Sequence, residues 1–266
     1  MEIIQSKDNL LIKEIKKLKE KKHRISSNMF LVEGFRFAEE AIDSDFEVVH
    51  IFISARGELK YENSSLKSKI QKETKIYSIS DSLFKSICDT EHPQGIMAVV
   101  RNKPVEIKYD QGFYMLVDKI QDPGNMGTII RTAHAAGALG VIITKGTVDI
   151  YNEKTLRATM GSIFKIPIIY DIDLSLVQKL RNSGFKLVAS SLDTEKNFYD
   201  VDLKRKVIIS VGNEGNGIST EVYDLCDLKI KIPMPGGAES LNAAVAASIM
   251  MYEVVRQKNN IRVTNL

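Results

Sequence analysis

The chain has 266 residues, of which 44% are hydrophobic and 27% are charged. This composition is that of a globular protein, and it excludes disordered, collagen-like and disulfide-rich chains. The longest apolar stretch, 240–252, is too short to span a bilayer, so we expect no contact with a membrane. The first residues lack the pattern of a signal peptide, which predicts a cytoplasmic protein. The four histidines and two cysteines are widely separated, and we expect no metal site.

The net charge of +3 is small, but the charges are unevenly distributed. Residues 13–24 hold seven basic side chains against two acidic ones, a net charge of +5 within one short segment. Apolar residues recur at helical spacing over 3–24, so the sequence predicts a basic amphipathic helix at the start of the chain. Two interpretations of its charge stay open: a solvated helix face, or a surface that binds phosphates.

The first hundred or so residues alternate between short apolar runs and helical patterns, which predicts a compact α/β unit. Strands are predicted at 30–32, 48–53, 76–79 and 96–100, and helices at 35–42, 65–72 and 81–87. A polar segment containing Pro104 and Gly112 follows. We expect this segment to hold the boundary between two domains, 1–105 and 106–266.

The second half of the chain has longer and more continuous apolar runs. Strands are predicted at 114–117, 141–143, 166–169, 187–189, 207–211 and 230–232. Helices are predicted at 126–136, 153–160, 174–182, 220–226 and 243–256. Strands that are apolar on both faces are typical of a parallel sheet covered by helices. Ligands of such sheets bind at the carboxyl ends of the strands.

The first of three glycine-bearing motifs has the sequence DPGNMG at 122–127 and leads into a predicted helix. Proline and glycine favour a tight turn, and Asn125 is predicted to cap the helix. Arg131 follows six residues later. This spacing lets both side chains face the sheet edge, although residues six apart do not lie on quite the same face of a helix. Taken alone, the segment is more typical of a turn, a cap and a surface arginine.

The second motif, GNEGNGI at 212–218, follows the predicted strand 207–211. Its glycine order reverses that of the dinucleotide fingerprint, so it does not indicate NAD binding. Glycines allow the backbone to approach a ligand closely, and Glu214 places a carboxylate among them. A tight turn explains the glycines equally well, but it does not explain the carboxylate.

The third motif begins where the strand 230–232 breaks at two prolines. The chain continues through two glycines and starts a helix rich in alanine and valine. Ser240 and Asn242 provide polar groups at the start of that helix. Small residues such as Ala244 and Ala247 are predicted to pack either in the core or against another subunit.

Together, in this order and spacing, the three motifs closely resemble those of the SpoU (TrmH-type) RNA 2′-O-ribose methyltransferases of the SPOUT superfamily. The resemblance covers about residues 113–257. The preceding α/β unit resembles the ribosomal-protein-like RNA-binding domain that many family members carry in front of the catalytic domain. The resemblance implies a SPOUT α/β domain with a mostly parallel sheet and a deep trefoil knot. It also implies S-adenosylmethionine bound in the knot and a homodimer formed through the C-terminal domain.

The resemblance further implies which residues act in the reaction. The polar catalytic set is Asn125, Arg131, Glu214, Ser240 and Asn242. The cofactor-binding set is Ala189, Ser190, Gly212, Ile232, Met234 and Leu241. Ala244 stands where many members have serine or threonine, so no side-chain role is expected at that position.

The implied reaction is methyl transfer to the 2′-hydroxyl of structured RNA, with ribosomal RNA of the large subunit favoured. Because a guanidinium stays protonated, Arg131 is predicted to clamp an RNA phosphate instead of acting as a base. Asn125 and Ser240 would orient the hydroxyl, and Glu214 would hold Arg131 or Asn125 in place. Three alternatives stay open: a tRNA 2′-O-methyltransferase, an enzyme that methylates a base nitrogen, and a non-catalytic RNA-binding protein.

Overall fold

The computed structural model describes residues 1–88 and 90–259, which form two compact units. Unit 1 comprises Met1–Pro104 and Tyr151–Phe164. Unit 2 comprises Val105–Ile150 and the described residues from Lys165 onward. The chain therefore passes from one unit to the other three times. Within the described ranges, no helix combines the length and the apolar composition that crossing a membrane requires.

Unit 1 is built on a five-stranded sheet with the order β1-β4-β3-β5-β2. Its strands are β1 (Glu2–Ile4), β2 (Met29–Glu33), β3 (Glu47–Ser54), β4 (Lys75–Ile79) and β5 (Ile96–Arg101). β1, β3 and β4 are parallel, whereas β5 runs antiparallel to its neighbours β2 and β3. The helices are α1 (Leu10–Lys17), α2 (Lys21–Ser27), α3 (Phe35–Ile42), α4 (Ala55–Glu62), α5 (Leu66–Lys69), α6 (Asp81–Ile87) and α8 (Glu153–Thr159), with a 3-10 turn η1 (Ser162–Phe164).

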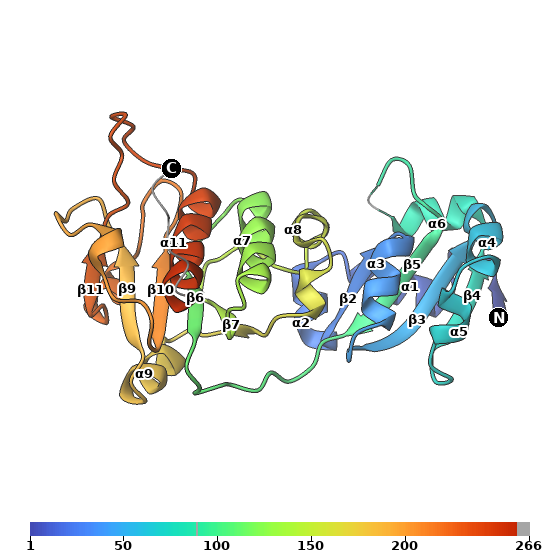
Figure 1. Cartoon of the computed structure of the whole chain (residues 1–266). Coiled ribbons are helices and arrows are strands. Elements are labelled where there is room, and N and C mark those ends of the chain that lie inside the picture. The colour runs from blue at the N-terminus through green and yellow to red at the C-terminus, as the bar shows by residue number, and fades with distance from the viewer. Residues whose placement is uncertain (89, 260–266) are drawn as a thin grey trace, which may run out of the picture. The chain divides into compact units, whose positions relative to one another are not determined.

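Helices cover both faces of this sheet. On one face, Ile12 and Ile15 of α1 and Ile87 of α6 form a buried cluster with Phe52 of β3. α3 lies on the opposite face (Figure 1). Side chains alternate between the faces along each strand, so one strand supplies core residues to both layers.

The start of the chain is not the single helix that the apolar spacing over 3–24 predicts. Its first residues form β1, with Ile4 paired to Ile79 of β4. The side chain of Asn9 then starts α1 by accepting a hydrogen bond from the backbone N–H of Leu11 at 2.9 Å. Periodicity alone does not separate a strand residue from a helix residue when the apolar spacing fits both.

A buried arginine of α2 contacts the end of α1. The Arg24 guanidinium donates hydrogen bonds to the carbonyl oxygens of Leu18 and Lys19, at 2.7 and 2.6 Å. These carbonyls lie just past the end of α1, where helix C-termini leave unpaired acceptors. Arg24 therefore points inward, although it belongs to the basic run that the sequence marks as a surface.

The segment Tyr151–Phe164 contributes aromatic side chains to the core of unit 1. The Tyr151 ring stacks on Phe30 with 4.3 Å between ring centroids. Phe164 packs against Phe30, Phe37 and Phe46 with centroid distances of 5.3 to 6.2 Å. The helix predicted at 153–160 forms as α8, but it joins unit 1 and does not cover the second sheet.

Unit 2 is built on a six-stranded sheet in which all pairs are parallel, with the order β11-β9-β10-β6-β7-β8. Its strands are β6 (Phe113–Val117), β7 (Gly140–Ile143), β8 (Ile168–Tyr170), β9 (Lys186–Ser190), β10 (Val207–Val211) and β11 (Leu228–Ile230). The helices are α7 (Pro123–Ala135), α9 (Ser175–Asn182), α10 (Thr220–Asp224) and α11 (Ala243–Lys258), with a 3-10 turn η2 (Phe198–Asp200). The predicted parallel sheet is thus confirmed, with strand ends shifted by at most two residues.

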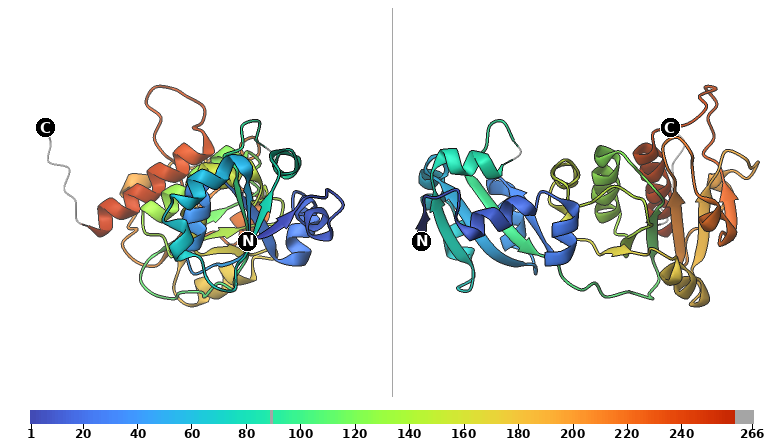
Figure 2. Two further views of the ribbon diagram at one scale, coloured as in Figure 1. Left: turned by 90° about the vertical axis from the view of Figure 1, so that its right-hand side faces the viewer. Right: turned by 180° about the vertical axis from the view of Figure 1, so that it is seen from behind.

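α7 and α11 lie side by side, and α11 also contacts β10 (Figures 1 and 2). Ala244 and Ala247 of α11 are buried, so their small side chains serve close packing in the core. The Ser248 hydroxyl, which donates to the carbonyl oxygen of Ala244, lies 3.3 Å from the hydroxyl of Thr132 on α7. This helix pair brings the start of α11 next to the start of α7.

Candidate active site

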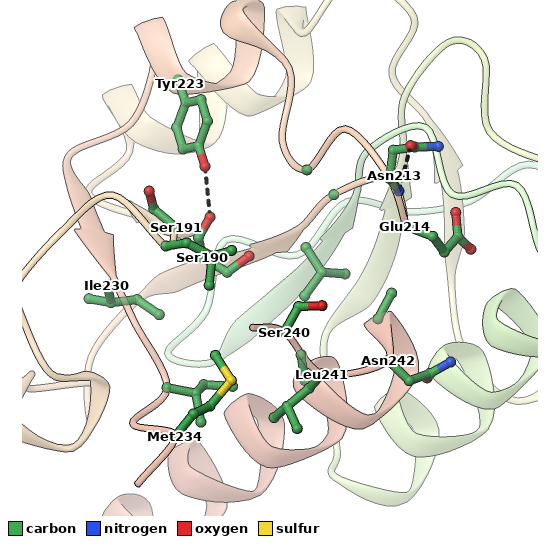
Figure 3. A pocket seen from close by; sticks show the side chains of 18 residues that line it. Ser190, Ser191, Asn213, Glu214, Tyr223, Ile230, Met234, Ser240, Leu241 and Asn242 are labelled. Atoms are coloured by element: carbon green, nitrogen blue, oxygen red, sulfur yellow. Dashed lines mark hydrogen bonds between the residues drawn. The ribbon is translucent and has the colours of Figure 1, made fainter. Parts of the chain in front are cut away.

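A pocket of about 430 Å³ lies in unit 2 at the carboxyl ends of β9, β10 and β11. Its walls come from residues 190–192, from the loop after β10 and from the segment that leads into α11 (Figure 3). This is the edge of a parallel sheet at which ligands bind. The volume falls within the range of roughly 300–1,000 Å³ that small-molecule sites occupy.

The loop after β10 is a tight turn that depends on two glycines. Asn213 and Gly217 exchange two backbone hydrogen bonds, at 2.8 and 2.9 Å. A Cβ atom on Gly212 would lie 2.1 Å from the carbonyl carbon of Gly217, so no other residue fits there. Gly217 has a φ of +69°, which glycine adopts at little cost. The turn places Glu214 at the pocket edge.

Three side chains, one from each motif, form a continuous chain of hydrogen bonds. Asn125 Nδ2 donates to Glu214 Oε1 at 3.0 Å, and Asn242 Nδ2 donates to Asn125 Oδ1 at 2.9 Å. Asn242 Oδ1 accepts from the backbone N–H groups of Ala244 and Val245 and so caps α11. Because an ionised carboxylate only accepts hydrogen bonds, Glu214 fixes the orientation of both amides.

Glu214 also holds the turn that precedes α7. Its carboxylate oxygens accept the backbone N–H groups of Gln121 and Asp122, both at 3.1 Å. Burial alone would raise the pKa of the Glu214 carboxyl, but the hydrogen bonds from Asn125, its own backbone, Gln121 and Asp122 together lower that pKa. Glu214 is therefore an ionised acceptor that positions its neighbours.

The residue that caps α7 is Asp122, and the prediction that Asn125 would cap it is wrong. Asp122 Oδ1 accepts a hydrogen bond from the backbone N–H of Asn125 at 2.7 Å. Asn125 itself lies in the first turn of the helix. Its side chain is thereby left to contact Glu214 and Asn242.

The structure brings most of the residues named from the motifs to this pocket. Those that line it are Ser190, Gly212, Glu214, Ile232, Met234, Ser240, Leu241 and Asn242. Glu214 and Asn242 lie on the side next to α7, and Ser190 and Met234 lie on the opposite side (Figure 3). Asn125 contacts the lining through its two hydrogen bonds. Ala189 is buried within β9 and Arg131 is exposed on α7, and neither lines the pocket.

Several lining residues were not predicted, and Tyr223 is the most informative of them. Its hydroxyl donates to the carbonyl oxygen of Ser190 at 2.9 Å (Figure 3). The Lys229 ammonium lies 4.5 Å from the centroid of its ring. Tyr223 comes from α10, outside the three motifs. The only signal for it was a predicted helix that starts soon after the second motif.

The lining combines apolar side chains with a few polar groups. Ile230, Ile232 and Leu241 give apolar surface, whereas Glu214 and the Ser240 hydroxyl are polar. Over residues 1–88 and 90–259, no three His, Cys, Asp or Glu side chains gather into a group that could hold a metal ion. The pocket therefore suits an organic ligand with an apolar ring and several hydrogen-bonding groups.

Comparisons with known proteins agree with this geometry. Residues 112–252 match the SpoU rRNA Methylase family, and residues 9–98 match the MRM3-like substrate binding domain. The chain is 36% identical over 254 residues to the 23S rRNA (guanosine(2553)-2′-O)-methyltransferase RlmP of Bacillus subtilis, covering 96% of this chain and 99% of that relative.

Two solved structures are similar over nearly the whole chain. The AdoMet-bound rRNA methyltransferase from Sinorhizobium meliloti has a TM-score of 0.85 and 29% identity, covering 98% of each chain. The SpoU methyltransferase AviRb from Streptomyces viridochromogenes, in complex with AdoMet, has a TM-score of 0.87 and 29% identity, covering 96% of this chain and 100% of that one. Since the family match spans more than half of the sequence and includes all three motifs, this chain belongs to the SpoU rRNA methylase family.

Proposed function

We propose that this protein transfers a methyl group from S-adenosylmethionine to the 2′-hydroxyl of a ribose in ribosomal RNA of the large subunit. The observation that carries the proposal is the hydrogen-bonded chain of Glu214, Asn125 and Asn242 beside the pocket. Family membership supports methyl transfer to RNA. The activity named for the B. subtilis relative supports the ribose position and the large-subunit substrate.

The pocket residues fit the proposed cofactor. Gly212 contributes backbone to the pocket wall, and its missing side chain lets the turn to Gly217 close tightly. Ile232 and Leu241 offer apolar surface to an adenine ring. Ser190 and Met234 complete the opposite wall, and Ala189 supports it from within β9. When bound, S-adenosylmethionine supplies a methyl group activated by its positively charged sulfur.

The polar side chains serve the ribose. The amide groups of Asn125 and Asn242 each retain one N–H beyond the bonds within the chain. Together with the Ser240 hydroxyl, these donors orient the 2′-hydroxyl and stabilise its oxygen as the proton leaves. Glu214 is a poor base because its pKa is lowered and its oxygens already accept three hydrogen bonds. We therefore assign the proton to an RNA phosphate oxygen or to water.

Arg131 is assigned to an RNA phosphate beside the target ribose. It is exposed on α7 and makes no hydrogen bond within the described part of the chain, so its guanidinium is available to a ligand. A planar guanidinium matches a phosphate through two parallel hydrogen bonds.

We further propose the assembly that the family resemblance implies. Val245 and Tyr252 of α11 are 48% and 51% exposed, and large apolar side chains at a surface favour an interface, here a homodimer through unit 2. The deep trefoil knot around α11 belongs to the same proposal. Residues 1–105 are proposed to recognise the RNA and 106–266 to carry the reaction. An enzyme acting on ribosomal RNA is expected in the cytoplasm, where ribosomes are assembled.

Mapping 2′-O-methylated nucleotides in ribosomal RNA tests the proposed activity. RNA from cells with and without the gene is compared, and the purified protein is then supplied with the unmethylated RNA and S-adenosylmethionine. We expect one large-subunit ribose to lose its methyl group without the gene and to regain it in vitro. Identical methylation maps together with no transfer in vitro would contradict the proposal.

Thermal unfolding tests the cofactor separately. S-adenosylmethionine is expected to raise the unfolding temperature of the full-length protein, because a ligand that binds only the folded state stabilises it. NAD and ATP are the controls, and we expect them to cause no shift. The cofactor is supplied at about a hundred times the dissociation constant expected for it. An unchanged unfolding temperature at that concentration would reject the assignment.

A further inference from the structure

Unit 2 carries a second open pocket, of about 600 Å³, which shares Asn213 and Gly217 with the first. The two pockets therefore meet at the loop that carries Glu214. The second pocket is lined by polar side chains from the loops after β6 and β10 and from the start of α10. Those used below are Lys119, Gln121 and Glu221. None of these three side chains has a part in the reaction proposed above.

Gln121 presents one fixed hydrogen-bond acceptor. Its Nε2 donates to the carbonyl oxygens of Lys119 and Gly146, at 2.9 and 2.6 Å. Both amide hydrogens are thus used, which leaves Oε1 as the group offered to a ligand. Within the described residues, no donor reaches that oxygen. The backbone N–H of Gln121 donates to Glu214 Oε2 at 3.1 Å, so the residue that carries this acceptor is bonded directly to the catalytic network.

Lys119 and Glu221 place a donor beside an acceptor. Lys119 Nζ lies 3.5 Å from Glu221 Oε2. The backbone of Lys119 has a φ of +57°, a conformation that non-glycine residues rarely adopt, and its N–H is held by the hydroxyls of Thr144 and Thr147. The backbone amide of Glu221, the Ser219 hydroxyl and the charge of Lys119 lower the pKa of the Glu221 carboxyl. The two side chains are 42% and 68% exposed, so the pair adds little stability and both charged groups stay accessible to a ligand.

We propose that this second pocket binds a guanine base of the substrate RNA, at or next to the methylated nucleotide; this inference rests on the proposed function. The Watson–Crick edge of guanine presents the acceptor O6, the donor N1–H and a second donor, the exocyclic amine. Lys119 and Glu221 match O6 and N1–H, and Gln121 Oε1 matches the amine. Adenine, cytosine and uracil each offer a single donor on that edge, so one of the two protein acceptors would stay unpaired. Proteins commonly read unstacked RNA bases on this edge.

Inosine provides the test, because it lacks only the exocyclic amine of guanosine. Guanosines at and beside the methylated nucleotide are replaced one at a time, and kcat/KM and equilibrium binding are measured with the full-length protein. At one of these positions, we expect inosine to lower the kcat/KM and the binding affinity of the wild type about tenfold, the effect of one unmade hydrogen bond. That position identifies the bound base as the methylated nucleotide's own or its neighbour's. For Gln121→Leu, we expect the guanosine and inosine RNAs to have the same kcat/KM and affinity at that position.

Two further variants sharpen the comparison. Glu221→Ala is expected to lower kcat/KM about tenfold for both RNAs without changing their ratio, because inosine retains N1–H and O6. Gln178→Leu is the control, since Gln178 is exposed on α9 and lines neither pocket; we expect wild-type values. Binding of S-adenosylmethionine and the unfolding temperature show whether each variant is folded.

The proposal is overturned if the wild type uses every inosine-substituted RNA as well as the guanosine RNA, or if folded Gln121→Leu retains the discrimination. If Gln121→Leu does not fold, Glu221→Ala decides, and an unchanged kcat/KM overturns the proposal. If the wild type methylates no RNA, the proposed function fails. Guanine binding by the second pocket is then judged from affinity alone, and equal binding of guanosine and inosine RNAs would overturn it.

Discussion

Glu214 joins the three motifs because its carboxylate only accepts hydrogen bonds. Replacing it by glutamine turns one of the two acceptor oxygens into an amino group. That donor then faces either the N–H of Gln121 or the N–H groups of Asp122 and Asn125. We expect Glu214→Gln to slow methyl transfer about a hundredfold, the usual effect of disordering a group that stabilises developing charge, while S-adenosylmethionine binding is retained. Single-turnover rates measure the first effect and thermal shift the second. Glu195→Gln, at an exposed carboxylate, is the control.

The same substitution has a defined pH dependence. The folded-state pKa of Glu214 lies below its ordinary value, so its contribution to stability is fully present above the pKa of the unfolded chain. The contribution is lost as pH falls through the lowered pKa. The difference in unfolding temperature between wild type and Glu214→Gln should therefore be largest near neutral pH and shrink in acid. A difference that grows on acidification would show that the carboxyl is not ionised.

Arg131 distinguishes a phosphate clamp from a base. Arg131→Lys retains the charge but loses the planar fork, so we expect methyl transfer to fall more than tenfold with cofactor binding intact, and Arg131→Ala to be slower still. Rates of the three proteins are measured as a function of pH. Lysine has the lower pKa of the two cations, so recovery of Arg131→Lys at alkaline pH would favour a base. Near-normal activity of Arg131→Ala would remove this residue from the site.

The sequence marked the polar residues of the pocket because prolines and glycines identify the ends of strands. Glu214 and Asn242 stand within or beside such turns and meet at one sheet edge. Tyr223 and Gln121 escaped notice for a physical reason: their positions follow from hydrogen bonds to distant carbonyl groups, which no local pattern records.

At the scale of elements, α1 and α2 show that a basic run is not uniformly a surface. Arg24 is buried, and Lys19 donates to the carbonyl oxygen of Cys88 at 2.8 Å. The helical spacing was correct for α1, but the break before α2 depends on Arg24 and on packing that periodicity does not contain. The charges that stay available to RNA are fewer than the sequence suggests.

Charge reversal tests these helices. Replacing Lys16, Lys17, Lys21 and Lys22 by glutamate is expected to weaken RNA binding and to reduce its salt dependence, by about 0.7 in the log–log slope for each RNA phosphate that the protein no longer neutralises. Binding is measured over a series of salt concentrations. The control reverses Lys72 and Lys85, two exposed lysines of unit 1. An unchanged affinity and slope would make the basic run a solvated face.

At the scale of the whole molecule, the fold class and the family were predictable, and both are confirmed. Six apolar runs, most of them followed by a helix, predict a parallel sheet whatever the details of each loop. The assignment of Tyr151–Phe164 to unit 1 was not predictable. It depends on contacts such as Phe30 with Phe164, which join residues far apart in the sequence.

A shortened chain beginning at Phe113 tests this division. It retains Tyr151 and Phe164 but lacks Phe30, so these rings are left without their partner, and we expect the chain to aggregate. Replacing residues 151–164 by a short Gly-Ser linker in the same chain should restore a well-behaved protein that binds S-adenosylmethionine and has little remaining RNA affinity. Light scattering and thermal shift measure both. If the two shortened chains scattered light equally and bound S-adenosylmethionine equally well, residues 151–164 would not need the rest of unit 1 to stay soluble.

The segment Tyr151–Phe164 also sets the order in which the protein can fold during synthesis. Phe30 leaves the ribosome long before Phe164, which follows 134 residues later. At about 5–20 residues per second, this interval lasts roughly 7 to 27 seconds. The first unit therefore completes its core only after translation of the second has begun, and its aromatic side chains stay uncovered until then. Apolar surface that stays exposed during synthesis favours aggregation, so we expect the N-terminal half of the nascent chain to be a target for chaperones.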